Sequence, residues 1–269
     1  MFDASNSVDR TGLTAHWPLE WLGYGDSYFY DDSYELPISE FPLSKVLTND
    51  GGTLGEGPNG IKKSVLVGIG LYEYYLYPDF KSKLFNVNNE DWSFFVWVKP
   101  TVLRSPIQID GTYTASILLS NGDFFNSNEF LPGAPDPVIN NSFGVYLSDT
   151  GWVVEYRAHG YELQFNNTHE MSASVWTHVG FTVSVDPPNG TTVKFYKNGS
   201  YLNEDTATNP NADDSPYGGA IGYADLRMPP LYNHSGTNSF LGSMADVWWF
   251  NGTAVGPDVV KQIYRRYAA

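Results

Sequence analysis

The chain has 269 residues, of which 42% are hydrophobic and 17% charged, so its composition is that of a folded protein able to bury a large core. The 30 acidic and 15 basic residues give a net charge of −15. Such a surface repels phosphate backbones and therefore predicts no nucleic-acid partner. The chain contains no cysteine, which excludes disulfides and thiolate zinc sites. No basic and apolar leader opens the sequence and no run of about 18 apolar residues occurs, so we expect neither a signal peptide nor membrane insertion.

Short apolar or alternating segments, each bounded by turn residues, follow one another along the chain. They occupy residues 64–69, 92–98, 116–120, 143–148, 152–156, 176–183, 193–197 and 245–250. The turn residues 149–151 and the pair Asn198-Gly199 each predict a β-hairpin. Many short strands at this spacing are typical of an all-β sandwich.

A single helix is predicted after Gly256. Pro257 suits a first helical turn and Asp258 favours the positive end of the helix dipole. Five apolar or aromatic residues then share one face: Val259, Val260, Ile263, Tyr264 and Tyr267.

The segments between the strands define the domain organisation. Residues 1–11 form a polar N-terminal arm, and residues 12–269 are expected to form one sandwich domain. Polar, Pro-rich and Gly-rich composition predicts long loops at 20–45, 121–141 and 203–239.

Six motifs in a fixed order carry a family resemblance. They are residues 12–20 (GLTAHWPLE), 48–54 (TNDGGTL), 92–100 (WSFFVWVKP), 176–182 (WTHVGFT), 195–199 (FYKNG) and 240–264, the last strand with its helix. Together they resemble the laminin G-like, or concanavalin A-like, lectin/glucanase superfamily. The resemblance implies a two-sheet antiparallel jelly-roll sandwich with one short C-terminal helix. Trp17, Trp97, Trp176 and Trp248 are then expected in the core.

Catalytic patterns are missing from the sequence. Glucanases of this superfamily carry two Glu with an Asp between them on one strand, which sets the two catalytic carboxylates about 5.5 Å apart. No Glu-x-Asp occurs here. Glu155 and Glu162 are the nearest strand carboxylates, and on one straight strand they would point to opposite faces. The five His show no ligand spacing, and His178 fits a strand. The sequence therefore predicts that the protein is not an enzyme.

Calcium is the candidate cofactor that the resemblance implies. Glu20 and Asp246 stand where the family has an acidic pair, one on the first strand and one on the last, and these strands are neighbours in the family fold. Two convergent carboxylates suit a hard cation. The alternative is a hydrogen-bonding or solvent-facing pair, and no other cofactor is expected.

Two aromatic clusters are candidates for a carbohydrate-binding surface or a subunit interface. The residues are Trp21, Tyr24, Tyr28, Tyr30 and Tyr34 in one segment and Tyr72, Tyr74 and Tyr75 in another. Aromatic rings with neighbouring polar groups suit sugars, but tyrosine is also common at protein interfaces. Plain packing is the third interpretation.

The leading hypothesis is a non-catalytic, lectin-like protein, extracellular or on a virion surface, that binds a glycan or cell-surface carbohydrate or mediates adhesion. The alternative is a self-assembling structural subunit of a capsid, fibre or filament, with neighbouring copies as partners and the sandwich as scaffold. A glycoside hydrolase is the third hypothesis, and the missing carboxylate pair disfavours it.

Overall fold

A computed structural model of the chain describes residues 8–19, 28–29, 47–49, 53–60, 63–67, 76–77, 84, 87, 90–103, 107–109, 112–114, 116–121, 142–147, 151–158, 161–186, 190–207, 219–221 and 240–268. Most of these residues lie in antiparallel strands that form two large sheets, as the sequence predicts, and a small separate hairpin that it does not predict.

The first sheet, sheet A, holds the longest strands. Its order is β16-β15-β14-β7-β18-β5-β4, and β1 also pairs with β18. The strands are β1 (Ala15–Trp17), β4 (Thr53–Glu56), β5 (Lys63–Val67), β7 (Trp92–Pro100), β14 (Thr177–Asp186), β15 (Gly190–Lys197), β16 (Ser200–Ala207) and β18 (Gly242–Asn251). The first and last predicted strands are therefore neighbours, as the family resemblance implies.

The second sheet, sheet B, faces sheet A and has the order β13-β12-β11-β10-β17-β6-β3-β2. Its strands are β2 (Tyr28–Phe29), β3 (Leu47–Asn49), β6 (Leu76–Tyr77), β10 (Ser116–Asn121), β11 (Ser142–Leu147), β12 (Trp152–Ala158), β13 (Tyr161–Asn167) and β17 (Gly219–Ile221). β8 (Ile107–Ile109) and β9 (Thr112–Thr114) form the separate hairpin, and a 3₁₀ turn, η5 (Pro58–Gly60), separates β4 from β5.

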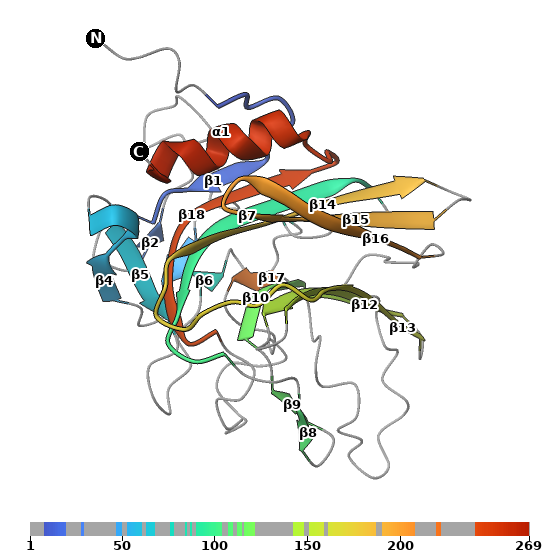
Figure 1. Ribbon diagram of the computed structural model, residues 1–269, viewed down its shortest axis with the longest axis horizontal. Coiled ribbons are helices and arrows are strands. Elements are labelled where there is room, and N and C mark those ends of the chain that lie inside the picture. Colours follow the sequence, from blue (N-terminus) through green and yellow to red (C-terminus); the bar gives the residue numbers. More distant parts are fainter. Residues whose placement is uncertain are drawn as a thin grey trace.

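The C-terminal helix α1 (Pro257–Ala268) covers the outer face of sheet A and makes a third layer (Figure 1). The main core lies between the sheets, where buried residues of β7 and β14 meet those of β10, β11 and β12. A second apolar layer lies between sheet A and α1. It contains Phe95, Tyr196, Trp248, Phe250, Val255, Val260 and Ile263, and adjoins a smaller group of Trp97, Ala245 and Tyr267.

Both predicted hairpins are confirmed. Leu147 of β11 pairs with Trp152 of β12 across the first turn. In the second, Asn198 and Gly199 join β15 to β16 with φ values of 50° and 74°. Two successive positive φ angles match the twist of the strands, and Asn-Gly adopts them at the lowest steric cost.

A β-bulge interrupts the last strand and has no counterpart in the sequence prediction. Ala245 pairs with Trp97 of β7, yet Trp248 pairs with Phe95, so β18 holds one extra residue at this point. Asp246 lies in the bulge with φ of 53°. The extra residue keeps the alternation on both sides, because Met244 and Val247 face the core between the sheets while Ala245 and Trp248 face α1.

The predicted core tryptophans divide between the two layers. Trp17 is packed between the sheets, whereas Trp97 and Trp248 pack beneath α1. Trp176 is only partly buried and contacts the group around Trp97. Strand alternation predicts burial here, but it does not distinguish a sheet-to-sheet core from a sheet-to-helix core.

Strands also occur inside the ranges expected to be loops. β2 lies within 20–45, and β17 and the end of β16 lie within 203–239. Part of the expected N-terminal arm packs on the domain, because Val8 contacts the apolar layer under α1 and the amide of Asp9 donates to Oε1 of Gln262 at 2.8 Å. Within the described part of the chain, no helix has the length and apolar character needed to cross a membrane.

Candidate functional site

The aromatic clusters predicted for binding are mostly outside the described residues. Tyr28 is the exception, and it lies in β2, where it pairs with Thr48 of β3 at the end of sheet B. The proposed metal ligand Glu20 lies outside the described ranges. So do the other aromatic residues predicted for binding: Trp21, Tyr24, Tyr30, Tyr34, Tyr72, Tyr74 and Tyr75. The predicted surface therefore stays a prediction for these residues.

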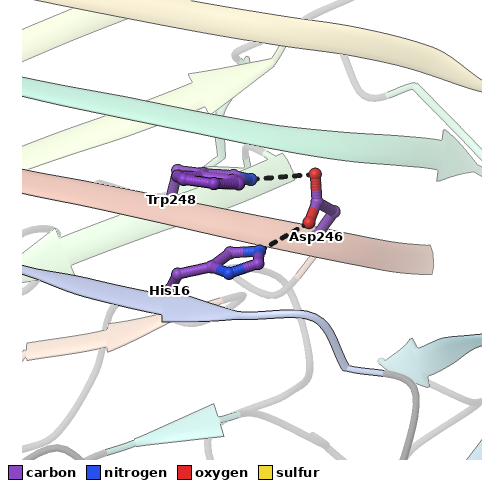
Figure 2. Close-up of polar contacts among 3 residues, drawn as sticks. All are labelled: His16, Asp246 and Trp248. Atoms are coloured by element: carbon purple, nitrogen blue, oxygen red, sulfur yellow. Dashed lines mark hydrogen bonds and ion pairs between the residues drawn. The ribbon is translucent and has the colours of Figure 1, made fainter. Parts of the chain in front are cut away.

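Asp246, the second proposed metal ligand, accepts two hydrogen bonds within sheet A (Figure 2). Its Oδ1 lies 2.6 Å from Nε2 of His16, and its Oδ2 accepts a hydrogen bond of 2.8 Å from Nε1 of Trp248. The backbone amide of Asp246 also donates to the carbonyl of Pro18 at 3.1 Å. Both carboxylate oxygens are thus bound by protein groups, and the bulge directs them to those groups.

Aromatic stacking closes this network. The rings of His16 and Trp248 stack with a centroid separation of 3.8 Å, and the side chains of His16 and Asp246 are completely buried. The guanidinium carbons of Arg10 and Arg266 lie 5.8 Å and 5.6 Å from the Trp248 ring centroid, within range of cation–π attraction. The N-terminal segment and α1 therefore both contribute a cation to the same tryptophan.

Such a closed arrangement acts as an internal connection between the first and last strands. A buried carboxylate needs hydrogen-bond donors, and the indole N–H and the imidazole supply them. Among the described residues, no three His, Asp or Glu side chains gather as metal ligands. Calcium at Glu20 and Asp246 stays a prediction, and the ion would compete with His16 and Trp248 for the oxygens of Asp246.

A second buried polar group, His178, lies beneath α1. Its ring centroid is 5.4 Å from that of Trp97, 5.8 Å from that of Tyr264 and 6.1 Å from that of Phe95. Burial lowers the pKa of His178 to about 3, because removing water penalises the charged imidazolium. The sequence predicts a strand residue here, which is confirmed, but the covering by α1 depends on a contact between distant segments.

The expectation for the carboxylates Glu155 and Glu162 was wrong in one respect. They do not lie on one straight strand, because the chain turns between β12 and β13. Glu155 pairs with Gln164, and Arg157 pairs with Glu162. Glu155 and Glu162 therefore lie on neighbouring strands, which was not visible without the hairpin between β12 and β13.

Comparison with known proteins shows the class of fold. No family model and no curated protein sequence matches the chain. Domain 4 of AbnA, an extracellular GH43 arabinanase from Geobacillus stearothermophilus solved with arabinotriose, superposes with a TM-score of 0.56 at 17% identity, over 94% of this chain and 98% of that one. A botulinum neurotoxin type C structure, from work on cell entry that depends on two ganglioside molecules, gives a TM-score of 0.57 at 11% identity.

The second and third similarities cover only part of the other proteins. The superposition covers 97% of this chain but only 52% of the neurotoxin structure. Trypanosoma rangeli sialidase, solved as a covalent intermediate with 2,3-difluorosialic acid, gives a TM-score of 0.52 at 12% identity, over 96% of this chain and 33% of that one. At these identities the chain shares the two-sheet β-sandwich fold with these proteins, and similarity of fold leaves the function open.

Proposed function

We propose that this chain is a non-catalytic carbohydrate-binding β-sandwich that works outside cells or on a virion surface. The observation that carries the proposal is the similarity to domain 4 of the arabinanase. That domain matches this one over nearly the whole length of both chains, and it was solved with a bound trisaccharide. A botulinum neurotoxin type C structure, about half of which matches this sandwich, comes from a protein whose cell entry depends on two ganglioside molecules.

The aromatic segment from Trp21 to Tyr34 is the proposed contact surface. It supplies six aromatic side chains, Phe29 among them, suited to sugar faces, with Asp26, Asp31 and Asp32 available to bond hydroxyls. A net charge of −15 favours neutral glycans or glycans met in a salty medium over strongly anionic ones.

The non-catalytic part of the proposal has its own support. His16 and Asp246 form an acid–base pair among the described residues, but both side chains are completely buried. The ring of His16 also stacks on Trp248, which packs under α1. A substrate could reach either group only if the residues that cover the pair moved.

A glycan array combined with native mass measurement tests the proposal against the subunit alternative. We expect a monomer that binds defined glycans, with arabino-oligosaccharides and ganglioside headgroups included on the array. Incubation of each bound glycan with the protein should leave its chain length unchanged. A large oligomer with no array signal would contradict the proposal and favour the structural subunit, and shortened glycans would favour a hydrolase.

A further inference from the structure

The apolar layer between α1 and sheet A, called the seam below, contains an ionisable side chain, His178, and no hydrogen bond within the described residues stabilises its charged form. His178 lies on β14, and its ring is enclosed by Phe95 and Trp97 of β7 and Tyr264 of α1. Neither of its ring nitrogens has a hydrogen-bond partner in the described protein, and the side chain is completely buried. The indole N–H of Trp97 in the same seam also has no partner.

No charged group of the described residues hydrogen-bonds the imidazole of His178. On α1, Lys261 and Arg265 are exposed and Arg266 lies over Trp248. On β15, the ammonium of Lys197 donates to the carbonyl of Glu170. The nearest acid of β18 is Asp246, whose two oxygens bond His16 and Trp248. Tyr264 is the titratable residue that contacts the imidazole from α1.

We propose that α1 is an acid-sensitive clasp, which leaves the outer face of sheet A when His178 is protonated while the two sheets stay packed together. An imidazolium in this seam would be a buried, unpaired charge, and opening the seam hydrates it. The helix contributes no strand, so its departure breaks no pairing in either sheet. The main core lies on the opposite face of sheet A and remains covered by sheet B.

The direction of the effect follows from proton linkage. In the docked state the pKa of His178 is about 3, whereas in the open state the imidazole regains its ordinary value near 6.5. The open state therefore binds more protons between these two values, and acid favours it. Above pH 6.5 the docked state keeps its full advantage, and below this the equilibrium moves about tenfold toward the open form for each pH unit until about pH 3.

Acid opening would expose an apolar surface that α1 covers at neutral pH. Phe95, Trp97 and Trp248 are buried under α1 and the N-terminal segment. Their exposure gives the opening an optical signal, because tryptophans in water respond to a soluble quencher. The inference does not depend on the proposed carbohydrate binding.

Hydrogen exchange of the full chain measures the clasp directly. Protection of α1 amides, corrected for intrinsic exchange rates, should fall about a hundredfold from pH 7.5 to pH 4.5, while β7 and β14 amides change much less. In a His178→Phe variant, which keeps an aromatic ring without a titrating group, α1 protection should lose this dependence. His169→Phe is the matched control at an exposed position, and it should behave as the unsubstituted protein.

Two results would overturn the inference. One is a loss of α1 protection between pH 7.5 and pH 4.5 in His178→Phe that equals the loss in the unsubstituted protein. The other is a simultaneous loss of protection in α1 and in β7 and β14 of the unsubstituted protein. An NMR titration of the unsubstituted protein covers the case in which His178→Phe does not fold. The His178 ring signals should show no titration near pH 6.5 while α1 is docked, and an ordinary titration there in the docked state would refute the proposal.

Discussion

Asp246 connects strand β1 at the start of the chain to strand β18 near its end. One oxygen meets His16 of β1, and the other accepts from Trp248, two residues further along β18. Its positive φ is unusual for a residue other than glycine, and the hydrogen bonds offset the strain. The sequence predicts Asp246 as a metal ligand or a hydrogen-bonding group, and it does not name His16 and Trp248 as partners, because the bulge that turns Asp246 toward His16 depends on pairing with β7 and β1.

Replacement of Asp246 tests the role of this network. Asp246→Ala should lower the free energy of unfolding by about 3–5 kcal/mol, because it leaves His16 and the Trp248 indole buried without their acceptor. Asp246→Asn should cost less, since its oxygen can accept from Trp248 while its amide donates to the other tautomer of His16. Urea unfolding measures both variants. Equal losses in the two, or a loss below about 1 kcal/mol in the alanine variant, would contradict the account.

The sequence correctly predicts the elements that begin or turn at characteristic residues, such as the Asn-Gly pair of a hairpin or the Pro and Asp of a helix start. The Asn198-Gly199 hairpin and the helix after Gly256 both follow from residues next to one another in the chain. The apolar layer beneath α1 was not predicted, because Trp97 alternates in its strand as any core residue does. Only the docking of α1 shows that its partners are Tyr264 and Tyr267.

The two-residue turn between β15 and β16 lies directly against Tyr264 of α1. A Cβ atom placed on Gly199 would lie 2.8 Å from Cβ of Tyr264, and the φ of Gly199 is 74°. Gly252 provides a matched control, because its φ is 79° but the nearest atom to an added Cβ is Oε2 of Glu90 at 3.6 Å.

Alanine at each glycine separates backbone strain from helix contact. Gly252→Ala should cost about 1–2 kcal/mol, the usual penalty for a left-handed residue with a Cβ. Gly199→Ala should cost clearly more, since Tyr264 must also move, and the excess should appear in thermal unfolding followed by circular dichroism. Equal costs at the two positions would mean that the turn does not press on α1.

At the scale of the whole molecule, six ordered motifs predict the two-sheet sandwich and its terminal helix correctly. The functional surface is harder to derive, because the composition of the segment from Trp21 to Tyr34 does not set the direction of its side chains. Tyr28 illustrates this difficulty, since it belongs to strand β2 within a range expected to be a loop. Sequence patterns carry local preferences, while a binding surface depends on which distant segments meet.

Calcium binding is also a property of the whole fold, because the proposed ligands Glu20 and Asp246 come from opposite ends of the chain. If an ion binds there, calcium at a hundredfold excess over its Kd should raise the free energy of unfolding by about 2.7 kcal/mol. Melting with calcium should then exceed melting with EDTA, and Glu20→Gln combined with Asp246→Asn should abolish the difference. Identical midpoints in the unsubstituted protein would exclude the site.

The most direct test of the central claim compares three proteins on one glycan array: the unsubstituted chain, a Tyr28→Ser/Tyr30→Ser variant and a Tyr201→Ser control. Tyr201 is half exposed on β16 and lies outside the proposed surface. We predict that the double variant loses glycan binding with a nearly unchanged melting temperature, while the control binds as the unsubstituted chain does. Retained binding in the double variant, or no binding by any of the three, would contradict carbohydrate recognition through this segment.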